Sequence, residues 1–102
     1  MRLVSGMQGI GRRFVYILRG ESDPERHYVG VASDVDERLA WHNHGPDGYT
    51  VNHRPWRLVV SIEFPSGQAA TRFEKYLKSG SGRAFAKRHF NSEDDGLNRP
   101  VR

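Results

Sequence analysis

Cysteine is absent from the 102 residues of this chain. The absence excludes disulfides, thiolate zinc sites and cysteine nucleophiles, and it suits a reducing compartment, so we expect a cytoplasmic protein. Long apolar runs are also lacking. No stretch approaches the roughly 18 residues of a membrane span, and residues 1–13 lack the apolar core of a secretory signal. We therefore expect no membrane contact, and any bound metal would have oxygen or imidazole ligands.

Acidic residues are the minority among the charged residues, with 12 Asp and Glu against 16 Lys and Arg and a net charge of +4. A basic balance favours a polyanionic partner, most often nucleic acid, although many basic domains bind none. The length suits a single domain. Glycines interrupt residues 1–12, and residues 91–102 hold few apolar side chains. We therefore expect flexible segments at 1–12 and 91–102 around a domain at 13–90.

Three apolar runs rich in β-branched and aromatic residues predict strands at 13–20, 27–32 and 56–64. A short polar segment with a proline separates the first two runs, which predicts an antiparallel hairpin. Helical signals occupy residues 34–45, 66–79 and 81–90. The order β-β-α-β-α-α predicts an α+β fold in which helices flank a small three-stranded antiparallel sheet.

Each predicted helix has recognisable end signals. Asp34, with Glu37 three residues later, predicts an N-cap, and Gly45 predicts a left-handed stop after a helix of about ten residues. Ser66 is the predicted cap of the second helix, and Ser81 is the predicted cap of the last one.

Residues 41–45, Trp-His-Asn-His-Gly, contain the letters that name the HNH nucleases. In those enzymes the named residues come from separate parts of a ββα motif. Consecutive helical residues point about 100° apart, so His42, Asn43 and His44 cannot converge on one phosphate. A histidine metal site made with His53 also lacks a paired-ligand spacing. Arg38 and His42, four residues apart, do share one helix face.

Two tyrosines and a glutamate are further candidates, each with an ordinary structural alternative. Tyr16 and Tyr28 lie centrally in adjacent predicted strands, where both phenols can point to one face, although such pairs are most often packing residues. Gly30 marks a place where a backbone or a ligand can approach closely. Glu74 lies in the second predicted helix with Lys78 one turn on, the spacing of a common surface ion pair.

Five short motifs in this order resemble the GIY-YIG nuclease domain, and the resemblance runs from about Phe14 to Phe90. The motifs are "VYI" at 15–17, "YVG" at 28–30, Arg38, "HN" at 42–43 and Glu74 beyond the third strand. The chain looks most similar to small single-domain bacterial members of that family, with the loop "YTVNHRPW" at 49–56 as an additional shared feature.

The resemblance implies a metal-dependent endonuclease that hydrolyses phosphodiester bonds in DNA, with structured or damaged DNA as candidate substrates. Glu74 would ligate a single Mg²⁺ or Mn²⁺, which would stabilise charge at the scissile phosphate and the leaving 3′ oxygen. Tyr16 would activate the attacking water, with its phenolate favoured by positive charge such as Arg38 or the metal. Arg38 would also donate to the transition state, and Tyr28 and His42 would hold the water or phosphate in line.

Substrate-binding roles are expected around this site. Gly30 would leave room for the substrate backbone, and Asn43 would brace the helix end beside it. A track of basic side chains would contact phosphates, with a solvated basic face as the alternative. Its candidates are Arg54, Arg57, Lys75, Lys78, Arg83, Lys87 and Arg88. Trp41 and Trp56 would stack on unpaired bases or, more commonly, pack in the core.

The alternative function is a nucleic-acid-binding module that has the nuclease fold but little or no catalytic activity. A basic chain of this kind would bind DNA without needing Glu74 or a divalent ion. Both functions imply nucleic acid as the partner, with DNA expected ahead of RNA, and neither fixes the oligomeric state.

Overall fold

The computed structural model describes residues 11–46 and 49–90. Strands β1 (Arg13–Gly20), β2 (His27–Ala32) and β3 (Trp56–Phe64) form an antiparallel sheet in the order β2-β1-β3. The predicted α+β fold and its β-β-α-β-α-α order are confirmed, with a short 3₁₀ helix η1 (Tyr49–His53) added in the predicted polar loop. The segments predicted to be flexible, 1–12 and 91–102, lie outside the described residues except for residues 11 and 12.

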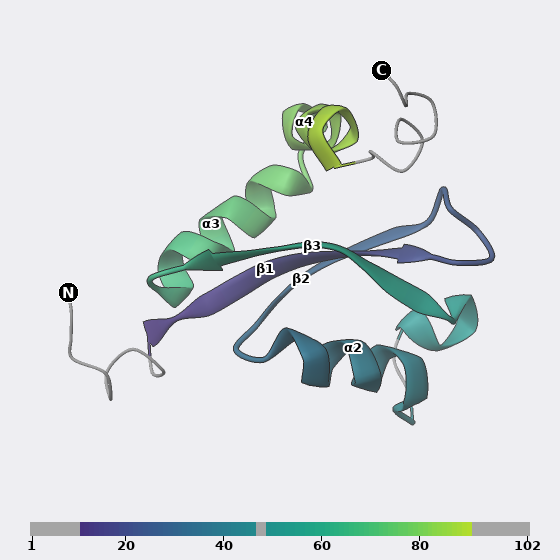
Figure 1. The fold of residues 1–102 in the computed structure, drawn as a ribbon. Helices are drawn as coiled ribbons and strands as arrows, with labels where there is room; N and C mark the ends of the chain where they lie inside the picture. Colours follow the sequence, from purple (N-terminus) through teal and green to yellow (C-terminus); the bar gives the residue numbers. More distant parts are fainter. Residues whose placement is uncertain (1–10, 47–48, 91–102) are drawn as a thin grey trace, which may run out of the picture.

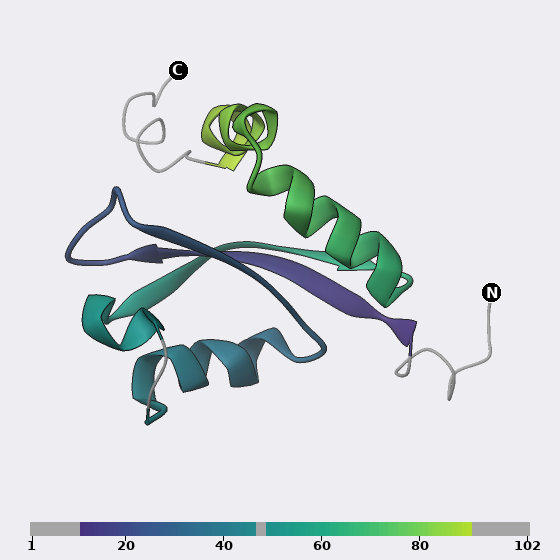
Figure 2. The same cartoon turned by 180° about the vertical axis from the view of Figure 1, so that it is seen from behind.

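Helices cover both faces of the sheet (Figure 1). Helix α2 (Val35–His44) lies on one face, and helices α3 (Gly67–Leu77) and α4 (Gly80–Phe90) lie on the other, as the view from behind also shows (Figure 2). Among the helices that the structure describes, none is both long enough and apolar enough to cross a membrane.

The central strand β1 sends alternate side chains to the two faces, and both sets are buried. Val15 and Ile17 pack against α3, whereas Tyr16 and Leu18 lie in a second cluster with Trp56. Because successive strand residues point to opposite faces, one strand supplies two separate cores. This explains why four consecutive residues of a strand with a polar tyrosine among them are all buried.

The hairpin register places the tyrosines of β1 and β2 near each other. Tyr16 pairs with Gly30 across the two strands, and Leu18 pairs with Tyr28. The rings of Tyr16 and Tyr28 lie on the same face, with centroids 6.2 Å apart. The prediction that both phenols point to one face is confirmed.

Two of the predicted helix caps are confirmed. The side chain of Asp34 accepts a hydrogen bond from the backbone N–H of Glu37 at 3.0 Å. The hydroxyl of Ser66 accepts one from the backbone N–H of Ala69 at 3.1 Å. Both satisfy N–H groups that lack a partner in the first helical turn.

Two predicted helix ends differ from the structure: α2 does stop at Gly45, but not through a left-handed glycine, and the predicted cap of the last helix is wrong. Gly45 has φ −70° and ψ 166°, an extended and not a left-handed conformation. A glycine fits there for another reason, because a Cβ atom would lie 2.6 Å from the carbonyl oxygen of Trp41. The last helix begins at Gly80, and the hydroxyl of Ser79, not of Ser81, accepts from the N–H of Gly82 at 3.1 Å.

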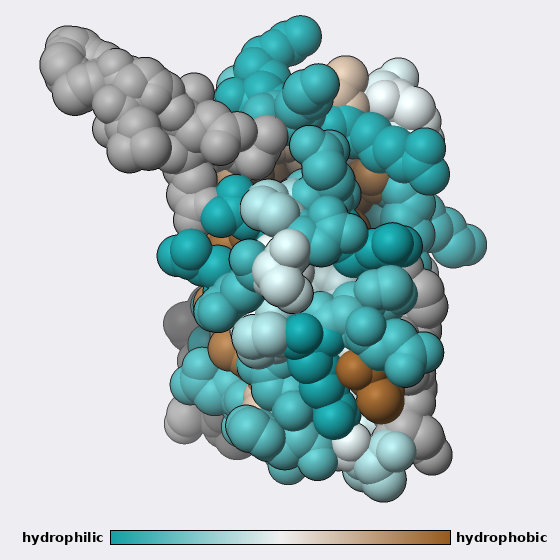
Figure 3. All heavy atoms as spheres, turned by 90° about the vertical axis from the view of Figure 1, so that its right-hand side faces the viewer, coloured by the Kyte–Doolittle hydropathy of each residue, from teal (hydrophilic) through white to brown (hydrophobic). Residues whose placement is uncertain are grey.

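The end of the molecule that holds the β1–β2 turn and η1 is mostly hydrophilic, with only small hydrophobic areas between the polar side chains (Figure 3). Its charged residues include Asp23 and Arg26, whose side chains pair at 3.7 Å. This end therefore presents no large apolar surface to a partner.

Candidate active site

A buried chain of hydrogen bonds joins the sheet to α2 and to η1. The hydroxyl of Tyr16 lies 2.9 Å from Nε2 of His42, and Nδ1 of His42 lies 2.9 Å from the hydroxyl of Thr50. The exposed fractions are 1% for Tyr16, 1% for His42 and 2% for Thr50. Both imidazole nitrogens are therefore occupied, and the ring is held in one orientation.

Tyr28 and Arg38 complete the side chains around the imidazole. The half-buried ring of Tyr28 has its centroid 4.6 Å from that of His42. The guanidinium carbon of Arg38 lies 4.5 Å from the ring centroid of Trp41, a cation-π contact that fixes this long side chain. Arg38 also faces the site, since its charge acts on both Tyr16 and His42.

Burial dominates the ionisation of the two central groups. It raises the pKa of Tyr16 above the ordinary value of a tyrosine; the Arg38 guanidinium lowers it in part, and Tyr28 and Glu74 raise it further. Arg38 alone therefore does not make Tyr16 a phenolate, and the expected help from a bound metal stays a prediction. Burial lowers the pKa of His42, and the positive charges of Arg38 and Arg54 lower it further, so the imidazole is neutral at pH 7.

Glu74 approaches the same phenol from the opposite face of the sheet. It lies on α3, its side chain is 21% exposed, and its charge acts on Tyr16. Strand β2 is the edge strand next to β1. Gly30 of β2 has no side chain that would block the phenol of Tyr16. The candidate residues of α2, β1, β2 and α3 thus gather at this edge.

Gly30 is the residue that makes room for the phenol. A Cβ atom at this position would lie 2.6 Å from the hydroxyl oxygen of Tyr16 and 2.7 Å from Cζ. The close approach expected at this glycine is therefore made by Tyr16. A role of Gly30 beside the substrate backbone stays a prediction.

Asn43 and Arg54 hold the end of α2 in place. The side-chain amide of Asn43 donates to the carbonyl of Trp56 at 3.0 Å and accepts from its N–H at 2.7 Å. Arg54 donates from Nε to the carbonyl of His42 at 2.6 Å and from a terminal nitrogen to that of Gly45 at 2.5 Å. Both side chains serve the fold, and their predicted contacts with substrate stay predictions.

Lys78 pairs with Glu74 at 3.0 Å, as the ordinary surface alternative predicts. Of the predicted phosphate track, Lys75, Arg83, Lys87 and Arg88 of α3 and α4 are exposed.

Trp56 is 2% exposed, and its indole N–H donates to the carbonyl of Thr50 at 2.9 Å, so it packs in the core and does not stack on bases. Trp41 is half-buried beneath Arg38.

Thr50 is the member of the site that the sequence did not single out. It lies in η1, eight residues after His42, and the contact depends on the turn between them. The only signal for Thr50 in the sequence was its place in the loop at 49–56, which the family resemblance includes. That signal does not say which group the hydroxyl contacts. The long-range bond to His42 is visible only in the folded chain.

A divalent cation would find one carboxylate at this site. Within residues 11–46 and 49–90, no three His, Cys, Asp or Glu side chains gather as metal ligands, which argues against the histidine site considered for His42, His44 and His53. Glu74 is partly exposed and offers the hard oxygen donor that Mg²⁺ and Mn²⁺ accept while keeping several waters. The residues present fit a single, largely hydrated ion.

Comparison with known proteins identifies the same region. A family model described as the GIY-YIG catalytic domain matches residues 12–91. The chain is 36% identical over 86 residues to the structure-specific endonuclease subunit SLX1 of Candida dubliniensis, which covers 78% of this chain and 29% of that protein. It therefore spans about three tenths of the length of this relative.

Smaller relatives match over more of their length. The chain is 39% identical over 71 residues to UPF0213 protein BH0048 of Halalkalibacterium halodurans, covering 69% of this chain and 73% of that protein. The solution NMR structure of that UPF0213 protein, from Bacillus halodurans, superposes with a TM-score of 0.50 at 27% identity, covering 89% of this chain and 99% of the other. The three-stranded sheet with its flanking helices is thus a shared fold.

Proposed function

Because the chain belongs to the GIY-YIG catalytic domain family, we propose that it is a divalent-metal-dependent endonuclease that hydrolyses phosphodiester bonds in DNA. The observation that carries the proposal is the hydrogen-bonded pair of Tyr16 and His42, with Arg38 and Glu74 near enough to act on the same phenol. Together these groups offer an activator of water, a donor to the phosphate and a carboxylate for a cation, which are the requirements of phosphodiester hydrolysis.

Tyr16 and His42 provide a path for the proton of the attacking water. We assign neutral His42 the tautomer that donates from Nδ1 to Thr50 and accepts at Nε2 from the phenol, because both contacts are compatible with it. As the water oxygen bonds to phosphorus, its proton passes to the oxygen of Tyr16 while the phenolic proton passes to Nε2, and the bond from phosphorus to the 3′ oxygen breaks. Solvent protonates the leaving oxygen, and the imidazolium then returns its proton to the oxygen of Tyr16 while the phenolic proton passes to the water that replaces the attacking one.

This path removes the need for a free phenolate. Burial raises the pKa of Tyr16, so at neutral pH the phenol is protonated and acts by exchanging one proton for another. The lowered pKa of His42 keeps the imidazole neutral and ready to accept. Since Tyr16 is only 1% exposed, its hydroxyl exchanges protons with His42 in preference to bulk solvent.

Arg38 and Tyr28 orient the reacting groups. The guanidinium carries five N–H donors in a planar fork, which suits two oxygens of a phosphate, and its contact with Trp41 limits its freedom. Tyr28 lies beside His42 and is less buried than Tyr16, so its phenol is placed to hold the water or the phosphate in line. Both therefore position substrate groups, and neither is needed to carry the proton.

Glu74 would hold the Mg²⁺ or Mn²⁺ ion, exchanging its contact with Lys78 for the cation. When bound, such an ion neutralises charge on the phosphate and on the leaving 3′ oxygen. Lys78 would then be free to contact a phosphate of the substrate, as the sequence predicted.

The test is cleavage of labelled duplex, nicked, flapped, branched and single-stranded DNA in the presence of Mg²⁺ or Mn²⁺. We expect cleavage that stops with EDTA and falls by about 100-fold or more in Glu74→Ala and Tyr16→Phe. Tyr76→Phe and Glu21→Ala are matched controls, because both side chains are exposed and lie outside the site. Neither control should change the rate.

The binding module is the other outcome of the same experiment. A chain that binds DNA but cuts none of these substrates, and that binds equally well as Glu74→Ala, would refute the nuclease. In that case the site residues would serve binding alone.

A further inference from the structure

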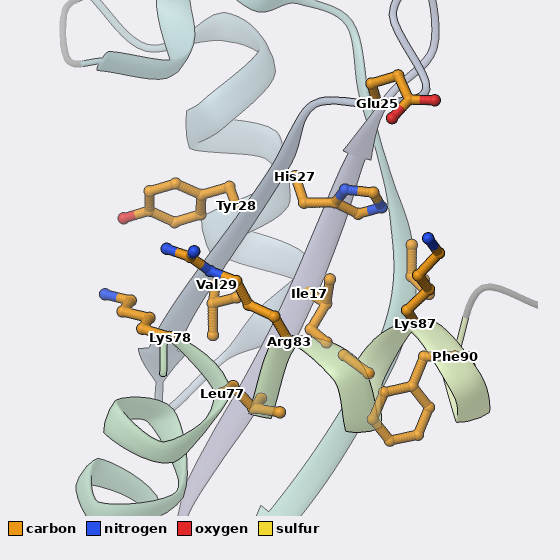
Figure 4. Close-up of a pocket in the computed structure, with 12 residues that line it drawn as sticks. Ile17, Glu25, His27, Tyr28, Val29, Leu77, Lys78, Arg83, Lys87 and Phe90 are labelled. Atoms are coloured by element: carbon orange, nitrogen blue, oxygen red, sulfur yellow. The ribbon is translucent and has the colours of Figure 1, made fainter. Parts of the chain in front are cut away.

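A pocket of about 530 Å³ lies between β2 and the helices α3 and α4 (Figure 4). Its floor is apolar and belongs to the core cluster of this face, with Ile17 of β1, Val29 of β2 and Leu77 of α3 in it. Val59, Ala86 and Phe90 complete the apolar lining. A pocket of this volume is within the range that holds a small organic molecule.

The rim of the pocket is cationic. Lys78, Arg83 and Lys87 are exposed lining residues, and one carboxylate, that of Glu25, opposes them. Lys78 is paired with Glu74, whereas Arg83 and Lys87 have no ion-pair partner among residues 11–46 and 49–90. The rim therefore favours an anion over an uncharged ligand, and the apolar floor favours one with an apolar part.

The pocket shares two residues with the surroundings of the candidate active site. Tyr28 lines it and also contacts His42, and Lys78 lines it and also contacts Glu74. In Figure 4 the side chains of Arg83 and Lys78 extend toward the side of the pocket on which Tyr28 lies. A ligand in this pocket therefore lies next to the residues assigned to hydrolysis.

We propose that this pocket takes an unpaired nucleotide of the substrate strand adjacent to the scissile phosphate, with its base against the apolar floor and its phosphate at Arg83, while Lys87 adds positive charge on the opposite side of the rim (Figure 4). The proposal rests on the proposed nuclease function and adds a substrate class to it. A nucleotide matches both features of the pocket, because its flat base suits the apolar floor and its anionic phosphate suits the cationic rim. A base that is paired and stacked in a duplex cannot enter a concave site without leaving the helix, whereas an unpaired base enters at little cost.

The first measurement is binding of thymidine 5′-monophosphate to the full chain, followed by methyl NMR signals of Ile17, Val29 and Leu77. We expect these signals to shift, and we expect Arg83→Ala with Lys87→Ala to weaken binding by about tenfold or more through loss of charged contacts. Arg72→Ala is the matched control, since Arg72 is an exposed cation of α3 that neither lines the pocket nor belongs to the predicted phosphate track. The control should bind as the native chain does.

The second measurement is the ratio of cleavage rates on a flapped and a nicked duplex. We expect Arg83→Ala with Lys87→Ala to lower this ratio by about tenfold while the nicked duplex is still cut, and Arg72→Ala to leave it unchanged. Two results would overturn the proposal that the pocket binds a nucleotide: unmoved methyl signals, or inorganic phosphate binding as tightly as thymidine monophosphate.

The two proposals fail differently. If flaps are cut and the mononucleotide does not bind, the nuclease stands and the pocket is refuted. If nothing is cut but the mononucleotide shifts the pocket methyls, the pocket is a nucleotide site and the nuclease is refuted. Glu74 does not line the pocket, and its removal frees Lys78 at the rim, so Glu74→Ala should bind thymidine monophosphate at least as tightly as the native chain even where it abolishes cleavage.

Discussion

The hydroxyl of Tyr16 and Nε2 of His42 lie 2.9 Å apart, with both side chains buried. The contact joins the central strand of the sheet to α2 and places a phenol next to a neutral base. In the proposed reaction this pair moves one proton, so its behaviour should follow the ionisation of His42.

The acid limb of the pH–rate profile should report His42. Burial and the charges of Arg38 and Arg54 lower its pKa, so cleavage should be retained at pH 6.5 and decline only at lower pH. A profile that already falls between pH 8 and pH 7 would contradict this assignment. His42→Gln should flatten the acid limb and reduce the rate, and His44→Gln, at an exposed position on the same helix, is the control.

The same pKa predicts how stability depends on pH. The unfolded chain protonates this histidine near pH 6.5, whereas the folded chain protonates it only at lower pH. The unfolded state therefore binds more protons in this window, and the free energy of unfolding falls as the pH drops below about 6.5. Thermal unfolding at pH 7.5 and 5.5 should show a smaller loss of Tm in His42→Gln than in the native chain.

Thr50 should act as a positioning residue for His42. Thr50→Val keeps the shape but leaves Nδ1 without its partner, which costs about 1–3 kcal/mol for a buried polar group. We expect a lower kcat, an unchanged KM for DNA and a shifted acid limb. Thr50→Ser, which restores the hydroxyl, should recover most of the rate. Equal losses in both variants would mean that the methyl group, and not the hydrogen bond, matters.

Gly30→Ala should abolish cleavage while the chain stays folded. The added methyl group would lie 2.6 Å from the oxygen of Tyr16, so the phenol must move away from His42. Gly80→Ala is the matched control, because a Cβ atom there meets nothing within 4 Å. Circular dichroism should show the same fold for both variants. Native cleavage by Gly30→Ala would show that the phenol position is not critical.

Lys78 should compete with the divalent ion for Glu74. Their side chains pair at 3.0 Å, and the cation needs the same carboxylate. In Lys78→Met the Mg²⁺ concentration for half-maximal cleavage should fall, while the KM for DNA rises because one phosphate contact is lost. Arg72→Met, which removes an exposed cation from the same helix outside the predicted phosphate track, should leave both values unchanged. A higher Mg²⁺ requirement in Lys78→Met would refute the competition.

Local patterns in the sequence predicted the strands, the order of the elements and two caps, because these depend on neighbours along the chain. Asp34 and Ser66 cap their helices through groups three residues away. The resemblance to the motifs of the family also identified five candidate site residues, namely Tyr16, Tyr28, Arg38, His42 and Glu74. The fold brings them to one edge of the sheet.

What the sequence did not predict depends on contacts between distant elements. The bond of Thr50 to His42 requires the turn into η1, and the contact of Gly30 with Tyr16 requires the register of two strands. The start of α4 is an exception, because its cap is a local bond from the N–H of Gly82 to Ser79, and the sequence offers two serines for this place, Ser79 and Ser81. The raised pKa of Tyr16 follows from burial, which a charge pattern alone does not reveal.

The alternation of β1 has a consequence for how this chain can change in evolution. Tyr16 faces the imidazole, while Ile17, its neighbour in the strand, faces the apolar floor of the pocket on the other side. Inserting or deleting one residue before Tyr16 within the strand would exchange the two faces, placing a phenol in the aliphatic core and an isoleucine beside His42. A point substitution in this strand changes the side chain on one face and keeps the alternation. A single-residue insertion or deletion would disrupt both the site and the pocket.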